Sequence, residues 1–144
     1  MKNQLEEKEM IRTRKAQYCR FLDTKQFEQW EKLFNPGAKI TFYGVDSRVL
    51  MSFDSFEAFA SLTRDLFATA QTIHQVHNSE IEFKSDTEAS AIWSMEDWHI
   101  YAPVDGNPSK TLHGYGHYHE TWKLIDGAWV IASIELRRTI LELN

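Results

Sequence analysis

The spacing of apolar residues along the chain changes near residue 70. Before that point, large apolar side chains recur at helical spacing, and residues 5–22, which contain no glycine or proline, predict a first helix. Residues 27–34 predict a second helix, which the Asn-Pro-Gly sequence at 35–37 should end. Both helices precede a short alternating segment at 39–43 that is typical of a strand.

Capping residues mark the helix starts. Asp23 and Thr24 follow the first helix, and either side chain is expected to cap the second. The sequence at 54–57, Asp-Ser-Phe-Glu, resembles a capping box and predicts a third helix that reaches Phe67.

From residue 71 onward the apolar positions alternate with a period of two, which indicates strands. Four long strands are expected, at residues 72–83, 88–101, 111–124 and 129–138. Asp126-Gly127 is a strong signal for a two-residue hairpin before the last strand. Residues 103–110 should form a loop, and Asn78-Ser79 should bend or bulge the first long strand.

This order of elements predicts an α+β fold in one domain that covers residues 1–144. Three N-terminal helices should pack on the concave face of a mixed, mostly antiparallel sheet. Strands of this length must coil strongly, and a coiled sheet closed by helices leaves a conical cavity. Aromatic residues, 13% of the chain, are suited to line such a pocket.

The strand at 88–101 carries the most informative pattern. One face is apolar and then becomes polar toward its end: Ala89, Ala91, Trp93, Met95, Asp97, His99 and Tyr101. That arrangement resembles the wall of a pocket with its titratable groups at one depth. Asp97 is either a second acid in the pocket or a polar residue at the strand end.

A second histidine, His74, lies on the preceding strand. An isolated strand histidine is more often structural than catalytic. Two histidines on one small curved sheet, with Asp23 at a helix end, favour acid–base chemistry, because a carboxylate beside an imidazole fixes its tautomer and raises its basicity.

Composition excludes several other function classes. The net charge is −5, with 16 basic against 21 acidic residues, which disfavours binding to nucleic acid or an anionic membrane. Cys19 is the only cysteine, and is expected to be a core residue of the first helix. Without a signal sequence or an apolar span, the protein is expected to be cytoplasmic.

Three further histidines share a strand face. His113, His117 and His119 have a spacing that can bind a metal, but no carboxylate or cysteine lies on the same strand face. A polar outer or subunit-facing surface is the favoured interpretation, and no metal is expected.

Several segments together resemble the scytalone dehydratase branch of the ketosteroid-isomerase-like superfamily, also called SnoaL-like or nuclear-transport-factor-2-like. The carrying segments are residues 18–25 (Tyr-Cys-Arg-Phe-Leu-Asp-Thr-Lys), 40–43 (Ile-Thr-Phe-Tyr), 72–74 (Thr-Ile-His), 97–101 (Asp-Trp-His-Ile-Tyr) and 125–129 (Ile-Asp-Gly-Ala-Trp). The 25 residues between His74 and His99 agree with the gap between that family's two active-site histidines.

The resemblance implies a role for each matching residue. Asp23 matches the helix-end aspartate, Tyr43 a water- or substrate-binding tyrosine, and His74 and His99 the active-site histidines. The chain departs from the pattern where Leu22 replaces a second tyrosine. It departs again where Gly116 and Tyr118 replace a small polar pair. Substrate contacts are expected from Tyr118, Trp93, Met95 and Asp97.

The function implied is that of a cofactor-independent dehydratase acting on a small, largely apolar cyclic or polyketide-like molecule. His74, assisted by Asp23, should remove a proton, and its imidazolium or His99 should protonate the leaving hydroxyl. Tyr43, with Tyr118 as a weaker candidate, should donate to a carbonyl oxygen. An isomerase or cyclase in the same pocket, or a non-catalytic binding module, are the alternatives. The resemblance also implies a homo-oligomer, with a trimer favoured over a dimer and Trp98 in the interface.

Overall fold

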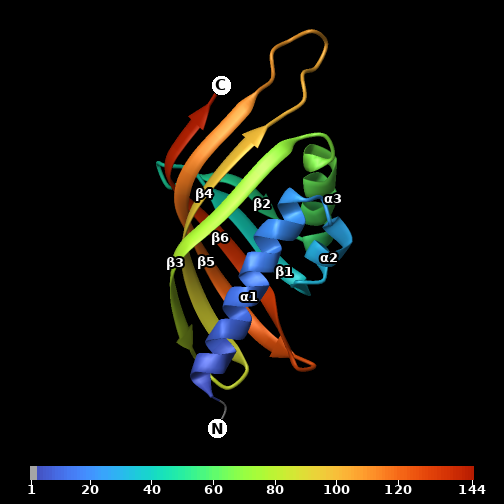
Figure 1. The fold of residues 1–144 in the computed structure, drawn as a ribbon. Coiled ribbons are helices and arrows are strands. Elements are labelled where there is room, and N and C mark those ends of the chain that lie inside the picture. The colour runs from blue at the N-terminus through green and yellow to red at the C-terminus, as the bar shows by residue number, and fades with distance from the viewer. Residues whose placement is uncertain (1–2) are drawn as a thin grey trace.

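The computed structural model describes residues 3–144. Three helices, α1 (Gln4–Asp23), α2 (Phe27–Glu31) and α3 (Phe56–Phe67), lie against one face of a curved sheet (Figure 1). The six strands are β1 (Phe34–Tyr43), β2 (Val49–Phe53), β3 (Gln71–Phe83), β4 (Glu88–Ile100), β5 (Thr111–Ile125) and β6 (Ala128–Leu143). None of the helices within residues 3–144 is long and apolar enough to cross a membrane.

The six strands form one mixed sheet in the order β2-β1-β6-β5-β4-β3. Every neighbouring pair is antiparallel except β1 and β6, which are parallel. The sheet is open, with β2 and β3 at its edges. This confirms the predicted α+β class and the cone-like sheet with helices on its concave face.

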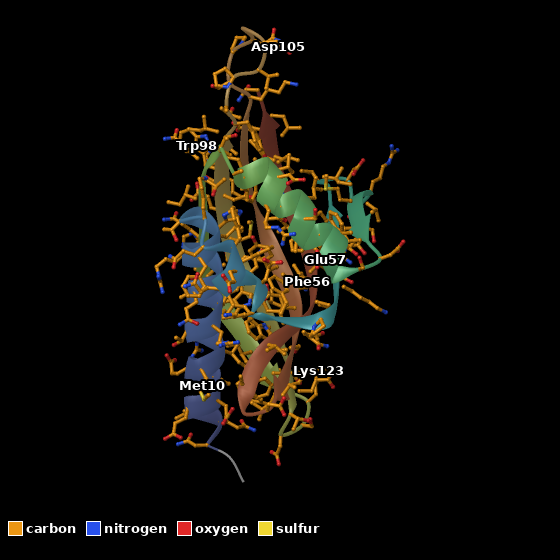
Figure 2. The ribbon with its side chains drawn as sticks, turned by 90° about the vertical axis from the view of Figure 1, so that its right-hand side faces the viewer. Met10, Phe56, Glu57, Trp98, Asp105 and Lys123 are labelled. Carbon is orange, nitrogen blue, oxygen red and sulfur yellow. The ribbon has the colours of Figure 1, made fainter. Side chains whose placement is uncertain are left out.

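Alternation along β4 sets which side chains face the helices. The odd-numbered residues from Ala89 to His99 are all buried, and the even-numbered ones are more exposed, as predicted. The register of β3 against β4 shifts between Val76 and Ser79, so the predicted irregularity near Asn78 is present. Asp126 and Gly127 both have positive φ in the turn from β5 to β6, which confirms the hairpin. The loop between β4 and β5 projects beyond the sheet, with Asp105 near its tip (Figure 2).

The predicted extent of the second helix was wrong. Helix α2 ends at Glu31, and Phe34 already pairs with Ile131 in the parallel ladder. The ring centroids of Phe34 and Phe56 are 4.6 Å apart. Strand pairing and core packing of Phe34 therefore outweigh the helical spacing of the apolar residues in this segment. The Asn-Pro-Gly sequence lies inside β1, where the register shifts and a proline needs no ladder hydrogen bond. Strand β2 was not predicted, because its mostly exposed residues show no alternation.

The caps also differ from the prediction. Ser55 does accept a hydrogen bond from the Ala58 backbone N–H, but the methyl side chain of Ala58 cannot accept the reciprocal hydrogen bond of a capping box. Helix α2 begins after Gln26 without a side-chain cap. The hydroxyl of Thr24 donates instead to the carbonyl of Arg20, and the carboxylate of Asp23 is turned toward the sheet.

Candidate active site

A cavity of about 310 Å³ lies between the inner face of the sheet and the helices. Most of its wall is apolar, with contributions from α1, α3, β1, β2, β5 and β6: Leu22, Phe42, Leu50, Met51, Phe53, Phe59, Leu62, Leu66, Phe67, Leu112, Leu136, Leu141 and Leu143. The polar side chains in the wall are Tyr18, Thr63, His74, Asp97, His99, Tyr101, Tyr118 and Arg138. Five of these contact one another and form one polar cluster: His74, Asp97, His99, Tyr101 and Arg138.

The turn after α1 places Asp23 beside this cluster. Lys25 has a positive φ of 60°, which reverses the chain at the end of α1. Its Nζ donates to the carbonyls of Phe67 and Ala70, the first at 2.7 Å. Since Ala70 directly precedes β3, the same lysine ties the end of α1 to the start of that strand.

Asp23 and His74 are joined by two hydrogen bonds. The His74 backbone N–H donates to Oδ2 of Asp23 at 2.8 Å, and the ring Nδ1 lies 2.7 Å from Oδ1. The hydroxyl of Thr72 donates to the same Oδ1 at 3.0 Å. An ionised carboxylate only accepts hydrogen bonds, so this contact places a proton on Nδ1 of His74, and a neutral imidazole in this position has its lone pair on Nε2.

His99 lies directly beyond His74. The two Nε2 atoms are 3.2 Å apart, and the Nδ1 atom of His99 lies 3.0 Å from the hydroxyl of Tyr101. The ring of Phe67 packs edge-on against His99 with its centroid at 5.0 Å. Burial lowers the pKa of His99 despite the hydrogen bond to Asp97, which favours the neutral imidazole. Burial likewise raises the pKa of Tyr101 and keeps its hydroxyl protonated.

Asp97 and Arg138 form a buried ion pair behind the histidines. The two terminal guanidinium nitrogens, Nη1 and Nη2, donate to the carboxylate at 2.5 and 2.9 Å, and the side chains of Asp97 and Arg138 are 2% and 8% exposed. Burial alone would raise the pKa of Asp97. The hydrogen bonds from His99 and Arg138, together with the guanidinium charge, outweigh burial and lower that pKa well below its usual range.

The structure brings most of the predicted residues together, but not all. Asp23, His74, His99 and Asp97 converge, and Tyr118 lines the cavity. Tyr43 is outside the cluster, since its neighbour Phe42 faces the cavity and the Tyr43 ring packs under the guanidinium of Arg137.

Trp93 and Met95 are buried on the expected face of β4 but do not line the cavity. The Trp93 indole donates to Glu120 at 2.7 Å, beneath the pocket. Leu22, at the position of the family's second tyrosine, contributes an apolar side chain to the wall. Cys19 is a buried helix residue as predicted, and burial raises its pKa to about 11.

Only one group of three residues in the described part of the chain has spacing suited to a metal ion. His74, Asp97 and His99 each offer a ligand atom, and these atoms lie within 4.8 Å of one another. Arg138 occupies both oxygens of Asp97, so a cation there would compete with a guanidinium. His113, in contrast, is bonded to Glu96 across the outer face at 2.8 Å and is stacked on Trp98.

Residues 3–135 match the SnoaL-like domain family. The chain belongs to this family. A curated relative, Probable cyclase FGR4 from Gibberella zeae, is 31% identical over 137 residues, which cover 90% of this chain and 89% of the relative.

Solved structures share the fold of this SnoaL-like domain at lower identity. A provisionally assigned scytalone dehydratase from Novosphingobium aromaticivorans superposes with a TM-score of 0.82 at 24% identity, covering 96% of this chain and 88% of its own. The hexachlorocyclohexane dehydrochlorinase LinA-type3 from Novosphingobium barchaimii superposes with a TM-score of 0.76 at 16% identity. The superposition covers 98% of this chain and 92% of the dehydrochlorinase.

Two members of the polar cluster in this SnoaL-like cavity, Tyr101 and Arg138, were not identified as site residues from sequence. Tyr101 continues the alternation of Asp97 and His99, so the strand pattern already contained the signal. Arg138 pairs with Asp97, 41 positions away in the chain. Arg137 pairs with Glu135 on the other face. No local pattern separates these two arginines, because their partners depend on the register of β6 against β5 and β4.

Proposed function

We propose that this SnoaL-like protein is a cofactor-independent lyase that eliminates water from a small organic molecule. The observation that carries the proposal is the Asp23–His74 pair at the polar end of an otherwise apolar cavity. A carboxylate bonded to Nδ1 makes Nε2 of His74 a base, and it stabilises the imidazolium that forms when Nε2 takes a proton.

The reaction begins at a carbon next to a carbonyl or an activated ring. Nε2 of His74 removes the proton from that carbon, and the electron pair of the C–H bond becomes the new C=C bond. The neighbouring C–O bond then breaks, and the departing oxygen takes a proton and leaves as water. Among the tyrosines expected to donate to the carbonyl oxygen, Tyr118 lines the cavity. Positioned acid–base groups contribute roughly 10²–10⁴ in rate, and no cofactor is required by these steps.

The cavity wall suggests the class of substrate. Leucine and phenylalanine side chains cover most of the surface, which suits a largely apolar ring or polyketide-like molecule. Five of the polar residues contact one another in a single cluster, so we expect a single oxygenated edge on the substrate. Names among the structural relatives are consistent with elimination, since one is a provisional dehydratase and another a dehydrochlorinase.

A cyclase or isomerase is the second candidate. It is favoured by the relative named Probable cyclase FGR4, which aligns over most of the chain. The same base could generate an enolate that attacks within the molecule or is reprotonated at another carbon. Water would then stay in the product.

The test is a screen of hydroxylated cyclic ketones and aromatic polyketides with mass detection. Elimination lowers the product mass by one water, whereas isomerisation leaves it unchanged. We expect Asp23→Asn and His74→Gln to lower kcat/KM by roughly 10²-fold or more. Asp65→Asn and His117→Gln, which change exposed residues away from the cavity, serve as matched controls.

Circular dichroism spectra test whether each variant is folded. Undiminished turnover in folded Asp23→Asn and His74→Gln overturns the proposal. Ligand binding without turnover would favour a binding module instead. Turnover should also survive dialysis against EDTA, because proton transfer needs no metal.

A further inference from the structure

The surroundings of His99 determine where its proton lies. Its Nδ1 faces the hydroxyl of Tyr101 at 3.0 Å, and its Nε2 lies 3.2 Å from both Nε2 of His74 and Oδ2 of Asp97. Asp97 is ionised and only accepts, and His74 presents a lone pair. If Nε2 of His99 carries a proton, its N–H faces two hydrogen-bond acceptors. If Nε2 is unprotonated, its lone pair faces the lone pairs of both neighbours.

The same logic applies to the other ring nitrogen. With Nε2 protonated, neutral His99 has its lone pair on Nδ1, and the Tyr101 hydroxyl donates to it. Burial keeps Tyr101 protonated and His99 neutral, in agreement with this arrangement. The two histidines are thus opposite tautomers: a carboxylate makes His74 an acceptor at Nε2, and a hydroxyl makes His99 a donor at Nε2.

We propose that His99 is the acid of this site, and that Tyr101 is the positioning residue that fixes its tautomer and replaces the proton it gives up. The assignment rests on the elimination proposed above, in which either imidazole could protonate the leaving oxygen. Asp97, held by Arg138, orients the same N–H bond from the other side.

The protons balance over one turnover. His74 takes the substrate proton on Nε2, and the leaving oxygen takes the Nε2 proton of His99 and departs as water. Tyr101 passes its proton to Nδ1 of His99 in that step, so His99 stays neutral and Tyr101 becomes a phenolate. Hydroxide is far more basic than a phenolate, which makes this transfer favourable. The proton on His74 then crosses 3.2 Å to Nε2 of His99, and His99 returns its Nδ1 proton to Tyr101.

The first test needs no substrate. Long-range ¹H–¹⁵N correlation spectra of ¹⁵N-histidine-labelled protein at pH 7.5 report the tautomer of each ring, with His74→Gln and His99→Gln providing the assignments. We expect the proton on Nδ1 of His74 and on Nε2 of His99. In Tyr101→Phe the Nδ1 resonance of His99 should shift as its hydrogen bond is lost, and in the control Tyr115→Phe it should not. A proton on Nδ1 of His99 in the wild-type protein overturns the inference.

The second test uses a substrate from the elimination screen. Tyr101→Phe should lower kcat by roughly 10- to 100-fold with KM nearly unchanged, and should reduce the solvent deuterium isotope effect on kcat. An unchanged kcat and isotope effect in Tyr101→Phe contradict the relay even if Asp23 and His74 prove essential. If no water is eliminated but the tautomers are as expected, the proposed lyase function fails while the assigned tautomers stand.

Discussion

Gly114 leaves the space in which the guanidinium of Arg138 lies. A Cβ atom at residue 114 would overlap Nη1 of Arg138 and lie 3.2 Å from Oδ1 of Asp97. The absence of a side chain on β5 therefore allows β6 to place a cation against β4. The ion pair behind His99 depends on this glycine as much as on its two charged partners.

Gly114→Ala should consequently displace Arg138 from Asp97. We expect a loss of about 1–3 kcal/mol in the free energy of unfolding, together with a lower kcat. Gly116→Ala should lower the free energy of unfolding further, because its Cβ would overlap the backbone of Arg137, which cannot move aside as a side chain can. Gly37→Ala is the control, since nothing lies within 4 Å of its Cβ position. Urea unfolding measures all three, and equal costs for Gly37→Ala and Gly114→Ala would contradict the prediction.

Stability should decrease as the pH falls below 6.5. Burial lowers the pKa of His99 from its ordinary value of 6.5, so below that pH the unfolded chain takes up a proton that the folded protein does not. The loss begins near 6.5 and ends at the lowered pKa of the folded state. His99→Gln should therefore cost less stability at pH 5.5 than at pH 8, as measured by urea unfolding. A cost that does not change with pH would show that His99 titrates normally.

A second loss should follow at lower pH. The pKa of Asp97 is lowered in the folded state. The ionised carboxylate therefore contributes fully to the free energy of unfolding above pH 3.8, the ordinary pKa of aspartate, and this contribution is lost as the pH falls below that value. Arg138→Gln removes the guanidinium and should reduce this acid-dependent step. Melting temperatures recorded between pH 5 and pH 2.5 measure this step. If the melting temperature falls equally steeply with pH in wild type and variant, Arg138 is not what lowers the pKa of Asp97.

A buried ion pair beneath the cavity should be sensitive to the loss of either partner. Nζ of Lys15 lies 2.5 Å from Glu120, both side chains have no exposed surface, and the indoles of Trp93 and Trp122 donate to the same carboxylate. Lys15→Met leaves that charge buried without a cation, at a cost of about 3–5 kcal/mol. Adding Glu120→Gln removes the charge but keeps an acceptor for the indoles, so the double variant should recover part of the loss in urea unfolding. A double variant less stable than Lys15→Met would show that the carboxylate is compensated in another way.

We expect the outer face of the sheet to form the subunit interface of a homo-oligomer, with a trimer favoured. Ile73, Trp98 and His113 are register partners across β3, β4 and β5, and Tyr115 and Ile140 pair beside them on β5 and β6. Four of these are exposed apolar side chains: Ile73, Trp98, Tyr115 and Ile140. Trp98→Glu should shift the mass measured by light scattering toward the monomer, whereas the control Val104→Glu, in the loop after β4, should not. A monomeric wild-type protein would contradict this prediction.

Local pattern alone determined much of this fold. Alternation placed Asp97 and His99 on the buried face of β4, and the Asp-Gly pair specified the turn into β6, because both properties depend only on neighbours in the chain. The segments that resemble the family also pointed to Asp23, His74 and His99, which the structure brings together.

Tertiary structure decided which side chains meet. Asp23 could have capped α2, but it bonds His74 because Lys25 ties the end of α1 to the start of β3. Arg138 on β6 reaches Asp97 on β4 across β5, through the space left at Gly114, and Tyr43 lies outside the cavity while Phe42 lines it. These outcomes depend on strand register and on contacts between residues distant in the chain. A short stretch of sequence specifies the face on which a side chain lies, but not its partner.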